Sequence, residues 1–564
     1  MTLRNHIPAA AACSVLIFYA TTFASSYDQR LLALSGVYVI LVLGYQFIFG
    51  HAGALSLAQG SFFGAGAYTT GILASRWDLG FLSTLPLSIA IAALLAALVA
   101  APVLRLRTHY FALATLALAQ LLLLAAVNWE GLTGGANGLS GVPPVSILGW
   151  QAQRGLPLVA VVWAIAGVAM LLARQQMNPA RRAAFAIARE TPLAAPAFGI
   201  DAGLLRFRAF LISAAFGGAA GALFVHTNRV VSPETLGFGV MVTCLTMTVV
   251  GGRTRIAGAL IGALLLTHMP EWLRGLEAYY LVAMGALLLT MVLFAPDGLA
   301  AFLPAPKSQS GPAALPEHAV SATGFAGPPA TLDASGLHKA FGGIRALDGL
   351  SLTLASGEIV GVIGPNGAGK TTLANALSGI VPPDAGTMHL AGRMISYLAP
   401  HDIARAGLTR TFQAPQLPSA LEVRAIIATA RTHAGAQANA PTVEDALAFC
   451  GLADMASAPA GTLPHGLRRR VEICRAIVSR PSVLILDEPA AGLTLEEQAE
   501  IGTLCRALAD AGMAILPIDH NVDFLKPIAD RLVCMAEGRI LAYGNPDGVL
   551  ADPAVRAAYF GMDA

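Results

Sequence analysis

The sequence predicts an all-α membrane domain at residues 1–303, followed by a soluble α/β domain at residues 331–564. Hydrophobic residues make up 55% of the 564 residues and charged residues only 12%, about half the charged share of an average soluble domain. Residues 1–303 carry 16 Arg, no Lys and 9 acidic residues, whereas residues 304–564 carry 15 Arg, 4 Lys and 24 acidic residues. The net charge of +2 is therefore a cancellation and indicates no class of partner. A soluble globular protein, a disordered scaffold and a disulfide-stabilised mini-protein are all poor fits.

Long apolar runs are confined to the first domain. A helix that crosses a bilayer needs about 20 consecutive, mostly apolar residues. Seven runs reach this length, near 7–25, 31–49, 83–104, 110–127, 156–173, 209–225 and 278–295. Three more are rich in glycine and are interpreted either as spans or as broken helices that face protein, at 52–75, 237–252 and 257–269. The sequence therefore predicts about ten spans. The first run is interpreted as a signal-anchor, because no convincing cleavage site follows it.

The arginines predict the orientation. Segment 174–208 carries six of them and is expected to be cytoplasmic, and ten spans then place both termini on the same side. Within this segment, Asn178 and Pro179 are a good helix start, so residues 178–201 predict a short helix. It is interpreted either as a solvated loop or as a docking helix for the second domain, and its charged residues are Arg181, Arg182, Arg189 and Glu190.

Residues 304–330 are rich in Pro, Gly, Ala and Ser and predict a flexible linker. The six cysteines are isolated in the sequence, at 13, 244, 450, 474, 505 and 534. They indicate neither a disulfide framework nor a zinc site, and they fit a reducing compartment. No run of acids or histidines lies in the spans, which disfavours charge-coupled transport.

The second domain contains a phosphate-binding loop. A β-branched strand, 359–363, leads into a match to G-x-x-x-x-G-K-[ST] and then into a helix. Backbone N–H groups of such a loop and the helix N-terminus bind phosphates. The sequence therefore predicts ATP and Mg²⁺ as cofactors, with Lys370 on the β- and γ-phosphates and Thr371 on the metal. The binding residues are Gly364, Pro365, Asn366, Gly367, Ala368, Gly369, Lys370, Thr371 and Thr372.

Two carboxylates follow the apolar strand 482–486. Asp487 is expected to hold Mg²⁺ through water, and Glu488 to polarise the attacking water. Either residue alone is also a plausible helix cap. Their position downstream of a phosphate loop favours catalysis.

At this point residues 331–564 resemble the ATP-binding subunits of ABC transporters, which have an α/β P-loop NTPase fold of ABC type. The resemblance implies three further roles. Gln413 in TRTFQ matches the glutamine that contacts Mg²⁺ and the membrane subunit, His520 in ILPIDHN matches the switch histidine at the γ-phosphate, and Phe341 in HKAFGG matches the aromatic residue that stacks on adenine. Without the family, His520 is an ordinary histidine and Phe341 a core ring.

A subgroup is also indicated. FGGIRAL, LDEPAAGL and AAYFG resemble the first ATPase of the branched-chain amino-acid importers, and GHAGALSLAQGSFFGAGAY, HYFALATLALAQ, AIARETPLAAPAFGID and FAPDGLA resemble a permease of the same system. The resemblance implies a second permease subunit, a second ABC ATPase subunit and an extracytoplasmic solute-binding protein as partners, together with the lipid bilayer. No nucleic-acid partner is expected.

The signature loop departs from the family pattern LSGGQ. Here it contains Leu463, Pro464, His465, Gly466 and Leu467. Pro464 lacks the hydroxyl that, in the family, contacts the γ-phosphate held by the opposite ATPase, and Thr494 stands where the family often has Asp or Asn. We therefore expect an asymmetric ATPase pair, with a competent site that uses Glu488 and an impaired site that uses the Pro464 loop. Neutral drift of the motif is the alternative.

The predicted function is a permease/ATPase fusion subunit of an ABC importer in the bacterial inner membrane. It is an ATPase coupled to uptake of branched-chain amino acids or related solutes, and urea, amides or aromatic acids are alternative substrates. Two other functions are weighed against it. An exporter half-transporter predicts six long spans, and a non-hydrolytic, ATP-gated regulatory subunit is favoured only by Pro464.

Overall fold

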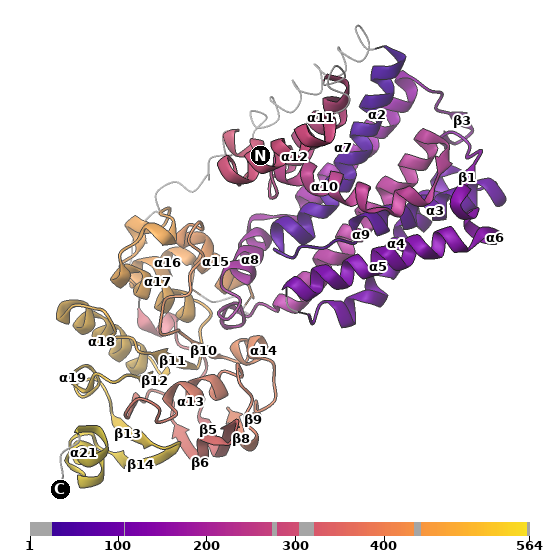
Figure 1. Ribbon diagram of the computed structural model, residues 1–564. Helices are drawn as coiled ribbons and strands as arrows, with labels where there is room; N and C mark the ends of the chain where they lie inside the picture. Colours follow the sequence, from indigo (N-terminus) through magenta and orange to yellow (C-terminus); the bar gives the residue numbers. More distant parts are fainter. Residues whose placement is uncertain (1–24, 107, 273–278, 304–320, 434–440, 561–564) are drawn as a thin grey trace. The chain divides into compact units, whose positions relative to one another are not determined.

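The computed structural model describes residues 25–106, 108–272, 279–303, 321–433 and 441–560. The chain forms two compact units (Figure 1). One contains residues 1–178 and 203–307, and the other contains residues 179–202 and 308–564. The segment 179–202 therefore belongs by its contacts to the second unit, although it was assigned to the predicted domain 1–303. The reason is the apolar face of the helix Pro179–Glu190, which packs within the second unit.

The first unit is helical. Its longer helices are α2 (Ser26–Tyr45), α3 (Gln59–Arg76), α4 (Phe81–Val103), α5 (Thr108–Asn128), α7 (Leu156–Gln176), α9 (Ala202–Asn228), α10 (Phe238–Gly251), α11 (Ile256–Trp272) and α12 (Tyr280–Phe294). The short helices α6 (Glu130–Thr133), η3 (Gly135–Asn137), η5 (Pro233–Leu236) and η7 (Leu299–Phe302) connect them. So do the two-residue strands β1 (Leu139–Ser140), β2 (Ser146–Ile147), β3 (Trp150–Gln151) and β4 (Val230–Val231).

The prediction of about ten spans is not confirmed. Five described helices are long and apolar enough to cross a membrane, namely Ser26–His51, Phe81–Val103, His109–Asn128, Leu156–Gln176 and Ala202–Asn228. Three apolar helices are shorter, Phe238–Gly251, Ile256–Trp272 and Gly285–Phe294. The predicted run 7–25 lies almost wholly outside the described residues. The glycine-rich runs form shorter helices that are separated by irregular segments.

Buried glutamines join the helices next to these irregular segments. Helix α2 continues into a π-helical turn, η2 (Gln46–His51), where the Gln46 amide donates to the carbonyls of Gly252 at 2.7 Å and Arg255 at 2.9 Å. The Gln59 amide donates to Leu41 and Ser213 carbonyls at 3.3 and 3.2 Å. Irregular backbone at membrane depth is tolerated where protein supplies such partners, which favours the broken-helix interpretation for these runs.

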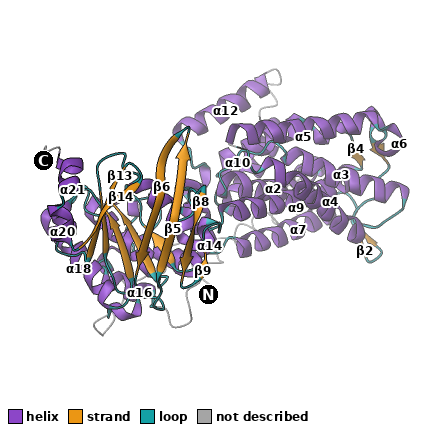
Figure 2. Cartoon of the chain, turned by 90° about the horizontal axis from the view of Figure 1, so that it is seen from below, coloured by secondary structure: helices purple, strands orange, loops and turns teal. Residues whose placement is uncertain are grey.

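The second unit contains two sheets (Figure 2). A six-stranded sheet has the order β10 (Leu408–Arg410), β11 (Val483–Asp487), β12 (Ala514–Ile518), β7 (Val360–Ile363), β13 (Arg531–Ala536) and β14 (Arg539–Gly544). Its neighbours are parallel except for the β13–β14 pair. A four-stranded antiparallel sheet has the order β6 (Ile344–Leu354), β5 (Leu332–Phe341), β8 (Ala385–Leu390) and β9 (Arg393–Met394).

Every residue of β7, β11 and β12 is buried, as expected for parallel strands that helices cover on both faces. The helices of this unit are α8 (Pro179–Glu190), α13 (Lys370–Leu377), α14 (Pro400–Arg405), α15 (Val423–His433), α16 (Val443–Phe449), α17 (His465–Ile477), α18 (Leu495–Asp510), α19 (Val522–Leu525), α20 (Pro546–Ala551) and α21 (Pro553–Phe560). The five described cysteines are free and buried.

The predicted linker 304–330 is described only from residue 321, and its last part is packed rather than flexible. Phe325 is fully buried and stacks on Phe449 with 4.7 Å between ring centroids. Gly327 N–H donates to the Pro481 carbonyl at 3.0 Å, and the Ser482 hydroxyl donates to Pro328 at 2.8 Å. The sequence of this segment shows no hydrophobic period. It is held instead by one aromatic ring and by hydrogen bonds to its backbone.

Candidate nucleotide-binding and hydrolysis site

The predicted site residues follow the strands of the parallel sheet. Lys370 comes after β7, Asp487 and Glu488 stand at the end of β11, His520 follows β12, and Gln413 follows β10. These four strands are parallel neighbours, so their carboxyl ends lie at one edge of the sheet. Ligands bind at this edge in open α/β sheets.

The phosphate-binding loop connects buried β7 to α13. Gly369, at its end, has φ +99°, and a Cβ there would overlap the backbone oxygen of Ala346, so glycine is required. The Lys370 ammonium donates to the loop carbonyls of Gly364 at 2.6 Å and Pro365 at 2.9 Å. Burial lowers the pKa of Lys370, although nearby carboxylates, Glu488 first, act in the opposite direction.

The other loop residues differ in exposure. Gly364 and Ala368 are buried, Pro365, Gly369 and Thr372 are half-buried, and Asn366, Gly367 and Thr371 are exposed. Exposed backbone at the centre of the loop and an exposed hydroxyl at the start of α13 suit a phosphate chain and its metal. Three or more His, Cys, Asp or Glu side chains do not cluster as a metal site anywhere in the described part of the chain. A magnesium ion here therefore needs phosphate oxygens besides Thr371 and Asp487.

Asp487 is 3% exposed and forms a buried ion pair with Arg410. Arg410 Nη2 lies 2.6 Å from Asp487 Oδ2. Its Nη1 donates to Asn375 Oδ1 at 2.6 Å and to Ser378 Oγ at 3.1 Å, and both acceptors lie in or next to α13. The carboxylate expected to hold Mg²⁺ is thus tied by one guanidinium to the helix that follows the phosphate loop.

Glu488 and Gln413 are in direct contact. Gln413 Nε2 donates to Glu488 Oε2 at 2.8 Å. Glu488 has φ +48°, and its N–H donates to the Ile518 carbonyl at 2.7 Å. A positive φ at a non-glycine residue is uncommon and is often found at active sites. The structure therefore brings these two predicted residues together.

His520 and Phe341 lie at the surface. His520 Nδ1 is 3.5 Å from Asp519, whose own carboxylate is buried and accepts from Ala490 N–H at 3.0 Å. Phe341 ends β5, is 49% exposed, and has the Lys339 ammonium 5.6 Å from its ring centroid. An exposed ring at a strand end can stack on a base, which a core ring could not do.

The signature loop keeps its helix. Pro464 is the N-cap of α17, with φ −55° and ψ 159°, and it provides no side-chain cap. Leu463 and Gly466 are buried, His465 is exposed, and Leu467 is half-buried. The loop therefore keeps a helix N-terminus but has lost the hydroxyl. Thr494 is also structural, because it caps α18 in a capping box with Glu497.

The apolar packing of segment 179–202 on the rest of the second unit uses residues that the sequence did not single out. Arg181 and Arg182 are exposed, and Arg189 pairs with Glu190 at 2.9 Å. The buried face of α8 is apolar and packs on α15, and it consists of Ala183, Ala184, Phe185, Ile187 and Ala188. The next turn, η4 (Ala195–Phe198), contacts α14, α15 and α17.

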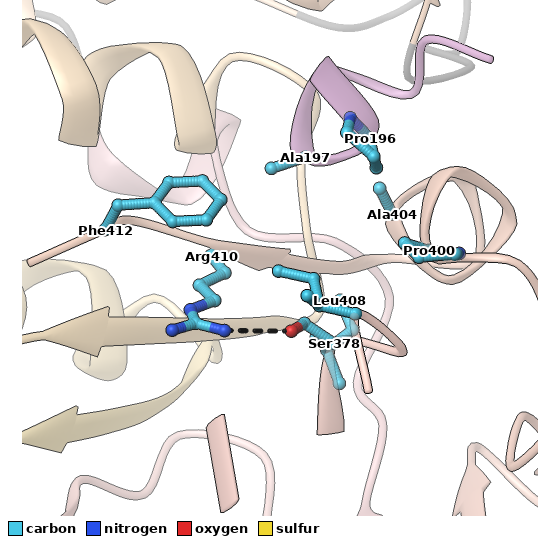
Figure 3. Close-up of a pocket in the computed structure, with 9 residues that line it drawn as sticks. Pro196, Ala197, Ser378, Pro400, Ala404, Leu408, Arg410 and Phe412 are labelled. Atoms are coloured by element: carbon cyan, nitrogen blue, oxygen red, sulfur yellow. Dashed lines mark hydrogen bonds between the residues drawn. The ribbon is translucent and has the colours of Figure 1, made fainter. Parts of the chain in front are cut away.

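Arg475 and Arg405 make the polar contacts with this turn. Arg475 Nη1 donates to the Ala197 carbonyl at 3.1 Å, and Arg405 Nη2 donates to the Gly199 carbonyl at 2.8 Å. Arg410 and Phe412 line a small cavity together with Pro196 and Ala197 (Figure 3). The sequence did not single out Arg410 and Arg475. Arg410 ends a three-residue strand and Arg475 lies in a helix with three other arginines, so no local pattern marks either residue as buried.

Comparisons with known proteins agree with this division. Residues 29–295 match the family described as branched-chain amino acid transport system / permease component, and residues 347–491 match the family described as ABC transporter. The high-affinity branched-chain amino acid transport ATP-binding protein BraF of Pseudomonas aeruginosa is 36% identical over 248 residues, which are 41% of this chain and 97% of that protein.

The lipopolysaccharide export system ATP-binding protein LptB of Escherichia coli K12 is 35% identical over 237 residues, with coverage of 42% of this chain and 98% of that protein. A crystal structure of a nucleotide-free ATP-binding cassette from an ABC transporter is 29% identical, covers 41% of this chain and 100% of that chain, and has a TM-score of 0.38.

Proposed function

The chain belongs to the ABC transporter family, in which it joins a permease domain of the branched-chain amino acid type to an ATP-binding domain, and from this premise we propose how its residues couple ATP hydrolysis to uptake. The observation that carries the proposal is the contact between Gln413 and Glu488 at the edge of the sheet where Lys370 and Asp487 also lie. This edge combines phosphate binding with a carboxylate that can act on water.

Each residue has a separate task. Lys370 exchanges the carbonyls of Gly364 and Pro365 for phosphate oxygens, because a buried ammonium needs acceptors in either state. Mg²⁺ would be held by Thr371 and Asp487 and supplies charge neutralisation at the phosphates. Glu488 polarises the attacking water, Gln413 orients Glu488, His520 senses the γ-phosphate, and Phe341 stacks on adenine.

The direction of transport and the substrate class come from the permease half. The ATP-binding half is almost equally similar to a branched-chain amino acid protein and to a lipopolysaccharide export protein, so it does not discriminate between them. Residues 29–295 match a permease component of branched-chain amino acid transport. We therefore propose import of branched-chain amino acids, with urea, amides and aromatic acids as the alternative cargo.

The proposed complex has further subunits. A second permease, a second ABC ATPase and an extracytoplasmic solute-binding protein complete it, in the inner membrane of a bacterial cell with about ten spans in this chain and the ATPase domain in the cytoplasm. The Pro464 loop makes one of the two composite ATP sites weaker than the other, because it offers a helix N-terminus without a hydroxyl.

Substitution of Glu488 tests this function. Purified complex in proteoliposomes, with its binding protein, is compared with Glu488→Gln and with Asp454→Asn, which changes an exposed carboxylate in the short helix η9 (Ala453–Met455). Glu488→Gln should lower ATP turnover by about hundredfold or more and abolish uptake, since it removes a general base. Asp454→Asn should behave as the unmodified complex.

One observation favours a second function. Pro464 removes a phosphate contact and so favours a non-hydrolytic, ATP-gated subunit. The same assay separates the two functions: equal ATP turnover in the unmodified complex and Glu488→Gln would contradict hydrolysis at this site and support the gating function.

A further inference from the structure

We propose that Arg475 and Arg410 form a positioning relay between the cytoplasmic turn η4 and the carboxylate of Asp487. The relay rests on the proposed function, because it gives the permease a route to the metal-binding side of the ATP site. It consists of three consecutive links, from η4 to Arg475, from Arg475 to the backbone of Arg410, and from the Arg410 side chain to Asp487.

The first link is a buried guanidinium on η4. Arg475 is 1% exposed, and its Cζ lies 4.6 Å from the centroid of the Phe198 ring. Its Nη1 donates to the Ala197 carbonyl at 3.1 Å. Burial lowers the pKa of Arg475 to about 10, so the group stays charged at neutral pH. A planar cation that both stacks and donates fixes the turn in distance and in angle.

The second link joins two arginines through the backbone. The other nitrogen of the guanidinium, Nη2, donates to the Arg410 carbonyl at 2.8 Å. Arg410 is the last residue of β10, which pairs in parallel with β11. Because Nη1 and Nη2 belong to one rigid group, a displacement of Ala197 changes the hydrogen bond that holds the end of β10.

The third link reaches the ATP site. The Arg410 side chain, 3% exposed, pairs with Asp487 at 2.6 Å and with Asn375 at 2.6 Å. Figure 3 shows Arg410 bonded to Ser378, with Ala197 and Pro196 on the neighbouring wall of the same cavity. A buried ion pair has little freedom to reorient without a change in its partners, so the position of Arg410 sets the position of the Asp487 carboxylate.

The direction of coupling follows from these contacts. Residues 195–198 lie between α7 and α9 in the sequence, so the chain itself connects η4 to both helices, and the relay requires that their movement displaces η4. Packed elements shift between discrete arrangements rather than deforming continuously. The relay therefore makes the affinity of the Asp487 side of the site for Mg²⁺ depend on the state of the permease.

A second arginine provides a matched control. Arg405 donates to the Gly199 carbonyl at 2.8 Å and pairs with Asp402 at 3.4 Å. Neither of these two contacts leads to β10 or β11. Loss of this side chain weakens docking of the same segment, whereas it leaves the three links intact.

The relay is tested by nucleotide binding in the full-length complex. Binding of a fluorescent ATP analogue is titrated with Mg²⁺ and with chelator, and the ratio of the two affinities is the Mg²⁺-dependent gain. Phe198→Leu and Arg475→Gln should lower this gain by about fivefold or more, the lower end of typical coupling between sites. Arg475→Lys should recover part of it, because the ammonium still donates hydrogen bonds but lacks the planar group that stacks on Phe198. Arg405→Gln should leave the gain unchanged.

Two results would overturn the relay. One is an unchanged Mg²⁺-dependent gain in Phe198→Leu, a variant that keeps an apolar side chain at η4 and is checked for folding by thermal melting. The other is an equal loss in Arg405→Gln. Binding needs no transport, so it decides the relay even if the unmodified complex shows no substrate-stimulated turnover, which would count against the proposed function alone.

Discussion

Removal of the Arg469 side chain has a predictable effect on the free energy of unfolding. Arg469 is fully buried on α17, and its Nη1 lies 3.0 Å from the equally buried Glu472. Its guanidinium also donates to three carbonyls, those of Phe412 at 2.5 Å, Gln413 at 2.6 Å and Glu488 at 3.1 Å. One side chain thus holds both the loop that carries Gln413 and the backbone of Glu488.

Arg469→Met keeps most of the volume and removes every donor. Loss of one partner from a buried ion pair costs about 3–5 kcal/mol. For a domain of about 150–250 residues, each kcal/mol shifts the melting temperature by about 2–4 °C. We therefore expect the ATP-binding domain of this variant to melt about 6–20 °C lower, with ATP turnover reduced because the Gln413 loop is released.

The loss of stability in Arg469→Met should depend on pH. Burial raises the pKa of Glu472, although Arg475 and Arg469 lower it in part. For an acid whose pKa is raised in the folded state, the contribution to stability is full below its ordinary value of 4.5 and is lost as pH rises through the raised pKa. Removing Arg469 raises that pKa further, so the stability deficit of Arg469→Met should widen with rising pH.

Thermal melting of the detergent-solubilised chain at several pH values measures this deficit. Arg469→Met combined with Glu472→Gln should recover much of the loss, because the orphaned charge is gone while an acceptor for Phe412 N–H remains. Arg470→Met is the control, since its partner Glu500 is about half exposed and surface pairs are worth about 0–1 kcal/mol. A double variant no more stable than Arg469→Met, or a deficit that shrinks with rising pH, would refute the reasoning.

Three further predictions concern the loop, a cap and a strand end. Pro464→Ser should raise or equalise ATP turnover of the assembled complex, whereas Pro464→Ala, which restores only the N–H, should not; unchanged turnover and transport in Pro464→Ser would favour neutral drift. Thr494→Ala should cost about 1 kcal/mol of stability in thermal melting, because Thr494 Oγ1 accepts from Glu497 N–H at 3.3 Å; Thr494→Asp, which keeps an acceptor, should not, and an equal loss would count against the cap. Hydrogen bonds from Lys339 and then Ala340 lower the pKa of Asp384, so its contribution to stability is full above the ordinary value of 3.8 and is lost as pH falls through the lowered pKa. The difference in melting temperature between the natural chain and Asp384→Asn should therefore become smaller only below pH 3.8. A difference that disappears at neutral pH would contradict a stabilising role of the Asp384 carboxylate.

Local sequence patterns predicted the secondary structure around the phosphate loop and the two carboxylates. Gly369 and Lys370 lie between a strand and the helix that follows it, and Asp487 ends another strand, so a few neighbouring residues define each position. The ion pair between Arg410 and Asp487 joins residues 77 apart in the sequence. Only the parallel order of β10 and β11 makes them neighbours, and no sequence period carries that information.

The membrane half shows why hydropathy alone does not define where helices begin and end. Segments 52–75 and 237–252 are apolar enough to predict full crossings, but each contains irregular backbone, at 52–58 and at 237 and 252. The Gln46 amide donates to the Gly252 carbonyl at the end of the second segment. Small residues also allow helices to pack closely. A Cβ at Gly66 in α3 would overlap the backbone of Gly218 in α9. A hydropathy window measures neither effect.

The arginines of segment 174–208 predict an orientation in the membrane, and Arg181 and Arg182 are exposed in the structure. The packing of this segment uses the apolar face of α8 and the turn η4. Arg475 and Arg405 add hydrogen bonds to the carbonyls of Ala197 and Gly199. The positive charge of the segment did not predict these packing contacts.

Helix α17 carries two functions that can be separated along its length. Its N-terminus is Pro464, which provides no side-chain cap and which, in the proposed complex, would face the composite site that the partner ATPase completes. Its body holds Arg469 and Arg475, whose contacts lie within this chain. Buried ion pairs are often no more stabilising than apolar residues of equal size, so we infer that this helix keeps its buried charges for positioning. The two proposals then assign separate tasks to this helix: the Pro464 loop would weaken one composite site, and Arg475 would transmit the state of the permease to Asp487.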